Sequence, residues 1–356
     1  MLVLAFDVGG VHIKSGLVEV AGESAPIVAR TIRRPFNFRA HAATLDEGLT
    51  AELRAHVGDE TVSLVVFTIT AETVGIFPTI AEGVIRICRI CAASFPATPV
   101  RFLSVHAGLE PLATVEEAPL DFASANWAAT ATLAAADIDD GLFIDIGSTT
   151  TDIIPIVDGM VSPAAVTDLG RLMSAELVYT GMERTLLPCI TQVLPLRGRL
   201  VSMATEVRAF TAHVYVLLGW LAEFGMRHPV TGCEMRIDRE ASLSAIARSI
   251  CADPSLISLE EAILMAEFVR DRQLALIVAA CRRVIASTWT ETVPLEFVVA
   301  GSGIRLAETA VRMLAAGPVV ESQALGRDAT NATALAAARL AAAGTLLGTG
   351  RGGGLP

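Results

Sequence analysis

Lys14 is the first residue in this 356-residue chain whose type points to chemistry, because it is the one lysine among 27 basic residues. A coding preference for arginine would remove lysine from ordinary surface positions, where either cation serves. An ammonium group, however, is a compact point charge, whereas a guanidinium group is a wide planar fork, so a tight loop facing a phosphate accepts lysine only. We therefore predict that Lys14 binds a phosphate, with the coding preference as the alternative explanation.

The segment around Lys14 has the pattern of a β-hairpin. An apolar strand from Leu2 runs into Asp7, Gly9 and Gly10 form a tight turn, and a second strand alternates out of the turn. Glycines in such a turn allow backbone N–H groups to approach a phosphate closely. A carboxylate at the end of the strand, such as Asp7, can hold a hydrated Mg²⁺ that bridges phosphate oxygens. Alone the pattern is weak, because any hairpin can carry an aspartate and two glycines.

The same pattern occurs again over residues 142–157. Superposing Asp7 on Asp145 gives an offset of 138 residues and places Lys14 opposite Asp152. Repetition at a spacing of about one domain indicates a duplicated fold with one phosphate-binding hairpin in each half. The alternative is an ordinary turn that matches the first hairpin by chance. The residues of the second turn are Gly147, Ser148, Thr149 and Thr150.

A third motif, Gly301-Ser302-Gly303, follows an apolar run at residues 295–300 and precedes a predicted helix. The N-terminus of a helix favours anionic groups, so this turn is predicted to contact a nucleotide or its equivalent. A Gly-x-Gly after a strand can equally begin an ordinary βα unit. Its significance comes from the order of the three motifs along the chain.

The elements that position these motifs are predicted to alternate between buried strands and Ala-rich helices. Together with the repeated hairpin, they predict an α/β protein with the duplicated, RNase H-like two-domain architecture of actin, Hsp70 and the sugar kinases, with a ligand cleft between the domains. Strands are predicted over residues 63–70 and 100–106, and helices over 122–136, 201–225, 240–252, 258–288, 305–315 and 331–343.

The domain boundaries follow from the position of the second hairpin. The first domain is predicted over residues 1–135, together with a C-terminal helix at 331–345, and the second over 136–330. Residues 346–356 are expected to form a flexible tail.

Composition excludes several classes of function. The formal net charge of −11 argues against nucleic-acid binding, because phosphate backbones require clustered Lys and Arg. No apolar stretch reaches the roughly 20 residues of a membrane span, and the N-terminus begins with a predicted strand instead of a basic leader, so we expect a cytoplasmic protein without membrane contact. The six cysteines, with Cys88 and Cys91 on one predicted helix, are expected to be buried, reduced thiols, and neither they nor the histidines have the spacing of a transition-metal site.

Four segments together resemble a branch of the hydantoinase/oxoprolinase-like proteins. This branch is found with tetrahydromethanopterin-linked one-carbon metabolism in methanogens and methylotrophs. The resemblance covers nearly the whole chain and is carried by Asp7–Gly10, Ala125–Trp127, Asp145–Pro155 and Glu176–Gly181.

The resemblance implies a transferase of methanofuran biosynthesis. In that reaction an aminomethylfuran-methyl diphosphate is joined to the phenol oxygen of γ-glutamyltyramine, and pyrophosphate is released. The partners would therefore be small molecules, a diphosphate substrate and a phenolic, amine-derived acceptor, while a homodimer is an assembly that the sequence leaves open.

The resemblance also suggests roles for individual residues. Asp7 and Asp145 would hold Mg²⁺, and Lys14 with the N–H groups of both turns would neutralise the leaving pyrophosphate. Glu72 or Asp152 would take the phenol proton. The predicted phosphate- and substrate-binding residues are Gly9, Gly10, His12, Asn126, Gly147, Ser148, Thr149, Thr150, Gly301, Ser302 and Gly303.

The chain departs from the family pattern at several positions. His12 and Ile13 replace an asparagine and a threonine, residues 74–75 and Ile80 replace an acidic and a basic residue, and His213 replaces an aspartate. These changes leave open a non-catalytic paralogue that acts as a binding protein. A second alternative is an ATP-dependent small-molecule kinase of the same fold, which would bind nucleotide phosphates with the same hairpins.

Overall fold

The structure is a computed structural model that describes residues 1–19, 27–58, 60–228, 232–314, 317–322, 325 and 332–346. The chain divides into two compact units. Unit 1 comprises residues 1–139, 156–171 and 321–356, and unit 2 comprises residues 140–155 and 172–320. The division assigns residues 156–171 to unit 1, although the sequence analysis placed them in the second domain, because strand β9 (Met160–Val161) packs beside helix α4 (Asn126–Ala134).

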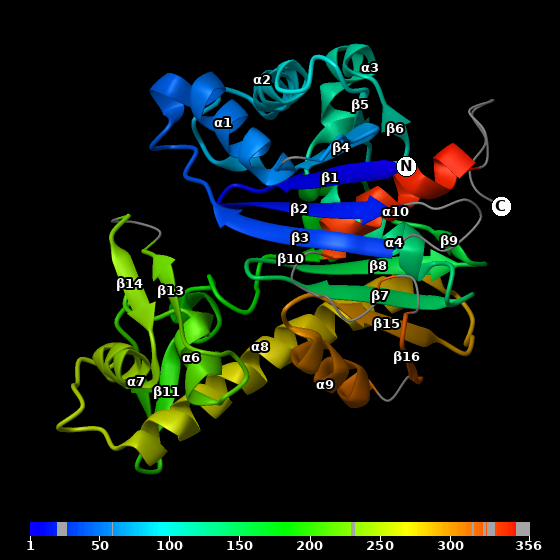
Figure 1. The fold of residues 1–356 in the computed structure, drawn as a ribbon. Helices are drawn as coiled ribbons and strands as arrows, with labels where there is room; N and C mark the ends of the chain where they lie inside the picture. Colours follow the sequence, from blue (N-terminus) through cyan, green and yellow to red (C-terminus); the bar gives the residue numbers. More distant parts are fainter. Residues whose placement is uncertain are drawn as a thin grey trace. The chain divides into compact units, whose positions relative to one another are not determined.

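Unit 1 is built on a six-stranded sheet in the order β3-β2-β1-β4-β5-β6 (Figure 1). Strands β1, β2 and β3 are antiparallel neighbours, whereas β4 and β5 are parallel to β1. The strands are β1 (Leu2–Val8), β2 (His12–Glu19), β3 (Ile27–Pro35), β4 (Leu64–Ile69), β5 (Val100–Leu103) and β6 (Leu109–Glu110). The helices are η1 (Ala42–Thr44), α1 (Leu45–Val57), η2 (Ala71–Thr73), α2 (Ile80–Ala93), α3 (Leu112–Glu117), η3 (Pro119–Phe122), α4 and α10 (Ala332–Leu346), and α5 (Asp168–Ser174) begins in this unit.

Helices cover both faces of the central strands of unit 1, which explains why β1 and β4 are apolar along most of their length. Leu4 and Phe6 of β1 pack in one buried cluster with residues of α1 and α2. The other face packs against α10. Gly16 of β2 permits this packing, because a Cβ atom there would lie 2.8 Å from a side-chain carbon of Leu335.

Unit 2 contains a sheet in the order β10-β8-β7-β15-β16, with β9 paired to the end of β8. Its strands are β7 (Gly141–Ile146), β8 (Thr151–Val157), β10 (Leu177–Val178), β15 (Glu296–Ala300) and β16 (Val319–Val320). Two further hairpins are formed by β11 (Val193–Leu196) with β12 (Arg199–Ser202) and by β13 (Phe224–Arg227) with β14 (Glu234–Ile237). The helices are η4 (Leu187–Cys189), α6 (Thr211–Leu217), α7 (Arg239–Arg248), α8 (Leu259–Thr288) and α9 (Ile304–Leu314).

The two sheets repeat one strand order, which is the duplicated arrangement of the actin, Hsp70 and sugar-kinase fold. In each sheet a central strand, β1 or β7, continues into an antiparallel hairpin on one side. On its other side it is paired to a parallel strand, β4 or β15, that comes later in the chain. The third sequence motif therefore follows the strand of unit 2 that corresponds to β4 in unit 1.

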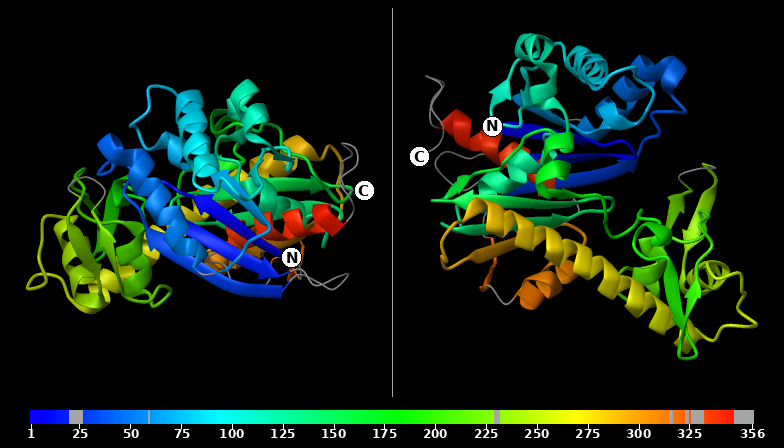
Figure 2. Two further views of the ribbon diagram at one scale, coloured as in Figure 1. Left: turned by 45° about the horizontal axis from the view of Figure 1, so that its top comes forward. Right: turned by 180° about the vertical axis from the view of Figure 1, so that it is seen from behind.

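Helix α8 is the longest element and runs from the β11–β12 hairpin to α9 within unit 2 (Figure 2). Its 30 residues span about 45 Å. A capping box fixes its start, since Glu261 N donates to Ser258 Oγ and Ser258 N donates to Glu261 Oε2. Helix α8 therefore carries side chains of one buried cluster along most of unit 2.

The helix predicted over residues 201–225 is wrong. Only α6, Thr211–Leu217, is helical there, and strands β12 and β13 occupy its two ends. Gly219 has φ +66°, a left-handed conformation that ends a helix. The apolar run is buried as expected, but periodicity alone does not show where the helix stops.

The cysteines are only partly buried, contrary to expectation. Cys88, Cys91 and Cys281 are buried, and burial raises the pKa of all three thiols. Cys189, Cys233 and Cys251 are exposed: Cys189 is the last residue of η4, Cys233 immediately precedes β14, and Cys251 follows the end of α7. In the part of the chain that the structure describes, no helix is both long and apolar enough to cross a membrane. Except for Leu346, the last residue of α10, the predicted tail lies outside the described residues.

Candidate functional site

The first turn joins β1 to β2 in unit 1 and has Asp7 at its entrance. Asp7 lies opposite Lys14 in the antiparallel pair, and Lys14 Nζ donates to Asp7 Oδ2 at 3.1 Å. The turn is closed by a hydrogen bond from Gly9 N to the carbonyl oxygen of His12 at 3.0 Å. A Cβ atom at Gly9 would lie 2.9 Å from that same oxygen, so only glycine fits without displacing the turn. The ammonium of Lys14 is thus held at the turn by a carboxylate that is only 4% exposed.

Glu72 lies at the same edge of the sheet as Asp7, because β1 and β4 are parallel and their carboxyl ends meet there. It follows β4 in the short helix η2, and Thr70 N donates to the carbonyl oxygen of Val8 at 3.1 Å. A Cβ atom at Gly10 would lie 2.7 Å from a side-chain carbon of Val74, so the first turn packs directly against this segment. Asp7, Lys14 and the segment that carries Glu72 therefore form one edge of unit 1.

A serine joins Glu72 to a second carboxylate. Glu72 Oε1 accepts from both Ser124 N and Ser124 Oγ at 2.9 Å, and Ser124 Oγ lies 2.9 Å from Asp168 Oδ2. One hydroxyl hydrogen can serve only one of these two carboxylates. Hydrogen bonds to both require that one of the two carboxyl groups carries a proton.

The Glu72 carboxyl group is readily protonated near neutral pH. Burial raises its pKa to about 7; the nearby Asp168 charge adds to this rise, while the Ser124 hydrogen bonds oppose it. Among the described residues, Glu72 Oε2 and the indole nitrogen of Trp127 are buried atoms without a hydrogen-bond partner. A carboxyl group that is half ionised near neutral pH and has one unsatisfied oxygen can accept or donate a proton.

The structure shows the surroundings of the residues that differ from the expected family pattern. Ile13 is fully buried in the core of unit 1, where an apolar residue packs better than a threonine. Arg39 Nε donates to the carbonyl oxygen of Val74 at 3.0 Å, so a cation from another segment lies beside residues 74–75. Ile80 is the first residue of α2 and is exposed, and His12 opens β2 with its Nδ1 atom 3.4 Å from Arg33 Nη2.

His213 has a structural role in α6. Phe210 N donates to His213 Nδ1 at 3.0 Å, so the imidazole satisfies a backbone N–H group at the start of the helix. Burial lowers the pKa of His213 to about 4, so it is neutral at pH 7 and can accept this bond. The aspartate expected at this position could accept a hydrogen bond from the same N–H group.

The second turn, in unit 2, repeats the first. Gly147 N donates to the carbonyl oxygen of Thr150 at 2.9 Å, and these two residues are offset by 138 positions from Gly9 and His12. Ser148 Oγ lies 3.4 Å from Thr149 Oγ1, which gathers hydroxyl groups at the turn. The same closing hydrogen bond in both turns supports the duplication inferred from the sequence.

The loop at residues 181–184, which the sequence analysis did not connect with the site, donates hydrogen bonds to the second turn. Met182 N donates to the carbonyl oxygen of Gly147, and the N–H groups of Glu183 and Arg184 both donate to that of Ser148. A Cβ atom at Gly181 would lie 2.6 Å from Thr149 N. These bonds fix the peptide planes of the turn and bring Arg184, whose pKa is lowered by burial, next to it.

The Gly301–Gly303 turn lies directly against the start of the second turn. Ala300 of β15 is the parallel partner of Asp145 on β7, and Gly303 N donates to the carbonyl oxygen of Ile146 at 2.8 Å. Gly301 has φ +85°, and a Cβ atom there would lie 2.2 Å from Asp145 Oδ1 and 2.3 Å from the Ile146 carbonyl oxygen. Ser302 lies between the two glycines, ahead of helix α9.

Gly301→Ala is expected to lower stability by about 2–4 kcal/mol, because backbone strain and a clash with Asp145 act together. Gly198→Ala is the matched control: Gly198 has φ +76°, but no atom lies within 4 Å of the position that a Cβ atom would take there. It should lose only the backbone contribution of about 1–2 kcal/mol. Chemical denaturation of both variants checks the difference. Equal losses would contradict the close approach of Gly301 to Asp145.

The structure distributes the predicted residues over two edges. Asp7, Gly9, Gly10, His12, Lys14 and Glu72 lie at one edge of the sheet of unit 1, with Asn126 as the first residue of α4, two positions after Ser124. Asp145, residues 147–150 and residues 301–303 lie at the corresponding edge of unit 2, and Asp152 lies on β8 opposite Leu177 of β10.

Ser124, Asp168 and the loop at residues 181–184 were missed. Ser124 immediately precedes the Ala125–Trp127 motif, which was a usable signal, and Gly181 is the last residue of the Glu176–Gly181 motif. Nothing in the sequence around Asp168 pointed to it, because its partner Ser124 is 44 residues away.

The residues present fit the usual mode of Mg²⁺ binding, in which waters and substrate phosphates supply most of the ligands. Among the described residues, no three His, Cys, Asp or Glu side chains are grouped so that they could hold a metal by themselves. Mg²⁺ usually keeps several waters and takes one or two carboxylates together with substrate phosphates, so one carboxylate beside each turn fits that mode. In unit 1, Asp7 also accepts a hydrogen bond from the ammonium group of Lys14.

Comparison with known proteins gives one curated relative that spans most of the chain. A (4-{4-[2-(γ-L-glutamylamino)ethyl]phenoxymethyl}furan-2-yl)methanamine synthase from Methanocaldococcus jannaschii is 30% identical over 284 residues, which cover 78% of this chain and 80% of that protein. A synthase of the same name from Methanococcus vannielii is 35% identical over 125 residues, covering 35% of this chain and 55% of that protein.

The solved structure of an acetone carboxylase is similar in fold, with a TM-score of 0.50 at 14% identity over 92% of this chain and 51% of that one. The sequence model of the Hydantoinase/oxoprolinase family matches residues 64–343. This match covers most of the chain and confirms the resemblance drawn from the motifs. The chain belongs to the hydantoinase/oxoprolinase family.

Proposed function

We propose that this chain is a transferase that makes the aryl ether of a methanofuran precursor, as the name of its relatives describes. The observation that carries this proposal is the 30% identity to the M. jannaschii synthase over four fifths of that protein's length. The name of the product contains a phenoxymethyl group on a furan that also carries a methanamine. The bond to be made therefore joins a phenol oxygen to a furan-bound CH₂ group.

We further propose that the CH₂ group arrives as a diphosphate ester. The C–O bond to the diphosphate breaks, pyrophosphate leaves with the electron pair, and the phenol oxygen forms the new C–O bond while its proton goes to a base. A furan ring stabilises positive charge that develops on the CH₂ group, so the protein must chiefly bind the leaving group and position the acceptor.

Each turn is a proposed phosphate-binding element of its own unit. In unit 1 the ammonium of Lys14 and the backbone around Gly9 would face an anion, and in unit 2 the turn of residues 147–150 would supply backbone and hydroxyl groups. Asp7 and Asp145 are the residues proposed to coordinate Mg²⁺ in their respective units. When bound, Mg²⁺ would neutralise charge on the leaving pyrophosphate.

Glu72 is the proposed base for the phenol proton. Its pKa of about 7 allows it to be ionised at neutral pH and still hold a proton after transfer. Its Oε1 atom accepts from Ser124, and Oε2 is a buried oxygen without a hydrogen-bond partner, so Oε2 is the oxygen proposed to take the proton. Asp152, the alternative base in the sequence analysis, lies within strand β8 of unit 2, opposite Leu177.

The cellular setting is part of the same proposal. We place the reaction in the cytoplasm, within the tetrahydromethanopterin-linked one-carbon pathway, with a small-molecule diphosphate and a phenolic acceptor as partners. Free thiols at Cys88, Cys91 and Cys281 agree with a reducing compartment. A homodimer remains a proposal, which size-exclusion chromatography with light scattering would test.

Incubation of the protein with γ-glutamyltyramine, the aminomethylfuran-methyl diphosphate and Mg²⁺ should give the ether and one equivalent of pyrophosphate, detected by mass spectrometry and phosphate assay. Calorimetry should show binding of pyrophosphate that Mg²⁺ strengthens and that Asp145→Asn makes insensitive to Mg²⁺. Binding of ATP with phosphorylation of an acceptor would favour the kinase instead. No product and no binding of either anion would favour a non-catalytic paralogue.

A further inference from the structure

A chain of buried polar side chains connects helices α6 and α8 to the loop at residues 180–185, which hydrogen-bonds to the second turn. Tyr215 Oη donates to Gln273 Oε1 at 2.7 Å. The amide nitrogen of Gln273 donates to Thr180 Oγ1 at 2.9 Å and to the carbonyl oxygen of Gly181 at 3.0 Å. Thr185 Oγ1 completes the chain by accepting from Gly181 N at 2.9 Å.

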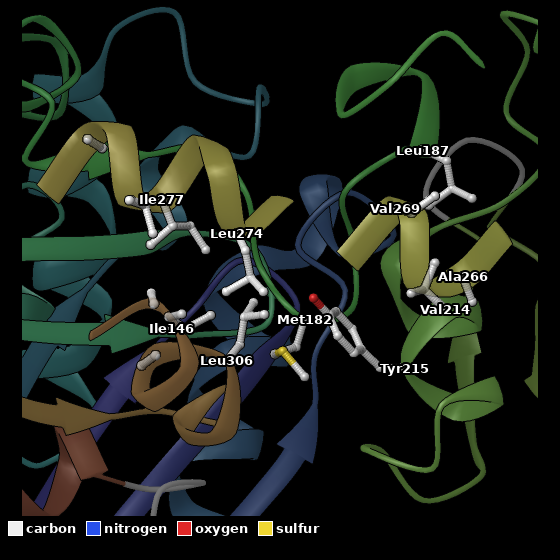
Figure 3. Close-up of a cluster of buried hydrophobic side chains, with 14 of the residues drawn as sticks. Ile146, Met182, Leu187, Val214, Tyr215, Ala266, Val269, Leu274, Ile277 and Leu306 are labelled. Atoms are coloured by element: carbon white, nitrogen blue, oxygen red, sulfur yellow. The ribbon is translucent and has the colours of Figure 1, made fainter. Parts of the chain in front are cut away.

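This chain lies inside the apolar core of unit 2. Tyr215 and Gln273 have no exposed surface, and Tyr215 is a member of the buried cluster that contains Leu274 and Met182. Figure 3 shows the Tyr215 ring near Met182, with its hydroxyl oxygen turned toward the side of α8 that carries Leu274. An amide buried among apolar side chains is costly unless its hydrogen bonds are made.

The two hydrogen bonds that the Gln273 side-chain amide donates can form only when the loop is in its observed position, because Thr180 and Gly181 are both part of that loop. The next residues of the loop hold the second turn: Met182 N binds the carbonyl of Gly147, and the following two N–H groups bind that of Ser148. A displacement of Gly181 would move the turn, since the two backbones already touch. Gln273 thus acts on the turn through a single loop.

We propose that Gln273 is a positioning residue for the diphosphate-binding turn of unit 2, with Tyr215 orienting its amide. The inference rests on the proposed function, because it takes residues 147–150 to be a phosphate-binding turn. It adds that α6 and α8, which carry none of the proposed ligands, set the geometry of that turn. Loss of the amide is therefore expected to weaken diphosphate binding without any change in a group that touches the ligand.

The test compares Gln273→Met and Tyr215→Phe with Ile277→Val. Methionine keeps the length of the glutamine side chain without its hydrogen bonds, and phenylalanine removes only the hydroxyl. Ile277 is fully buried on the same helix and in the same cluster, so its truncation loosens the core but leaves the polar chain intact. Melting temperature, pyrophosphate Kd and the KM of each substrate are measured for all three variants.

Gln273→Met should raise the pyrophosphate Kd and the KM of the diphosphate substrate by about tenfold or more, and should leave the KM of the phenolic acceptor near that of the wild type. Tyr215→Phe should give a smaller change in the same direction, and the double variant should bind no more weakly than Gln273→Met, since both act through one amide. Ile277→Val should lower the melting temperature without changing Kd.

Two results would overturn the inference. The first is an unchanged pyrophosphate Kd in folded Gln273→Met and Tyr215→Phe, and the second is an equal loss of affinity in Ile277→Val, which would reflect core stability alone. If wild-type protein itself fails to bind pyrophosphate, the proposed function fails, and that outcome is visible before any variant is made. If Gln273→Met does not fold, Tyr215→Phe still decides the question, because it removes one oxygen only.

Discussion

Glu72→Gln should lower kcat of the ether-forming reaction by about 10²- to 10⁴-fold, which is the usual contribution of a positioned general base. Glutamine keeps the shape of the side chain and can still accept from Ser124, but it cannot take a proton at neutral pH. Affinity for pyrophosphate should not change, because Glu72 is not one of the proposed phosphate ligands. Steady-state kinetics and calorimetry on the same variant measure the two quantities.

The pH dependence follows from the raised pKa of Glu72. The base must be ionised, so kcat/KM of the wild type should rise with pH and level off above about pH 7. Ser124→Ala removes a hydrogen bond that favours the carboxylate, so it should move this rise to higher pH. A profile that is flat from about pH 5.5 to about pH 8.5 in the wild type would exclude Glu72 as the base.

The stability of Glu72→Gln separates a catalytic role from a structural one. The folded state binds the Glu72 proton more tightly than the unfolded state, with a pKa of about 7 against the ordinary 4.5. The stability of the wild type must therefore fall as pH rises through that window, by about 3 kcal/mol in total. Glutamine carries no charge, so the variant should be more stable than the wild type at about pH 8 and similar at about pH 4.

Glu82→Gln provides the control. Glu82 lies in the first turn of α2 and accepts from Thr79 at the surface, so its change should alter neither kcat nor the pH profile. A Glu72→Gln protein that has lost activity and is also strongly destabilised at high pH would show that Glu72 maintains the fold. The proposal of a base would then be wrong.

Signals that are local in sequence predicted most of the fold. The two hairpins were found because strand, turn and strand follow each other within a short stretch of chain, and Gly9 and Gly147 mark the turns. The strand at 63–70 and the helix at 258–288 were placed within a residue or so, because long apolar runs with a clear cap leave little choice. The repeated hairpin then predicted the duplicated topology.

The parts that failed depend on groups far apart in the chain. Ser124 lies 52 residues from Glu72 and 44 from Asp168, and no spacing rule connects three such segments. Gln273 is 92 residues from Gly181. In the sequence it is one polar residue in a predicted helix that contains both polar and apolar residues, and nothing there indicates that it is buried. His213 resembles an altered site residue in the sequence, because a sequence cannot distinguish a helix cap from a ligand.

Lys14→Arg should weaken pyrophosphate binding nearly as much as Lys14→Ala, by about ten- to a hundredfold, if the compact ammonium contacts a phosphate from the first turn. A guanidinium group is wide and planar, so it cannot contact a phosphate in the geometry of a compact ammonium group. Loss of one charge-assisted hydrogen bond is worth roughly 1.5–3 kcal/mol, which corresponds to that change in affinity.

The structure adds an effect of Lys14 on stability that the sequence did not reveal. Lys14 pairs with Asp7, which is only 4% exposed, so Lys14→Ala leaves a buried carboxylate without its cation. This should lower the free energy of unfolding by about 1–2 kcal/mol at neutral pH. Lys14→Arg retains a positive charge and should lose less, whereas Asp7→Asn combined with Lys14→Ala removes both charges and should recover part of the loss.

Calorimetry with pyrophosphate, without added Mg²⁺, and thermal denaturation of these variants distinguish the two effects of Lys14. Omitting the metal removes any contribution of Asp7 as its ligand, so affinity then reports on the ammonium itself. A phosphate ligand predicts that the double variant regains stability but not affinity, because the ion pair concerns folding and the ammonium concerns binding. Wild-type affinity in Lys14→Arg would mean that any cation suffices there, and that the single lysine reflects a coding preference for arginine. Wild-type affinity in the double variant would leave Lys14 only its role as the partner of Asp7.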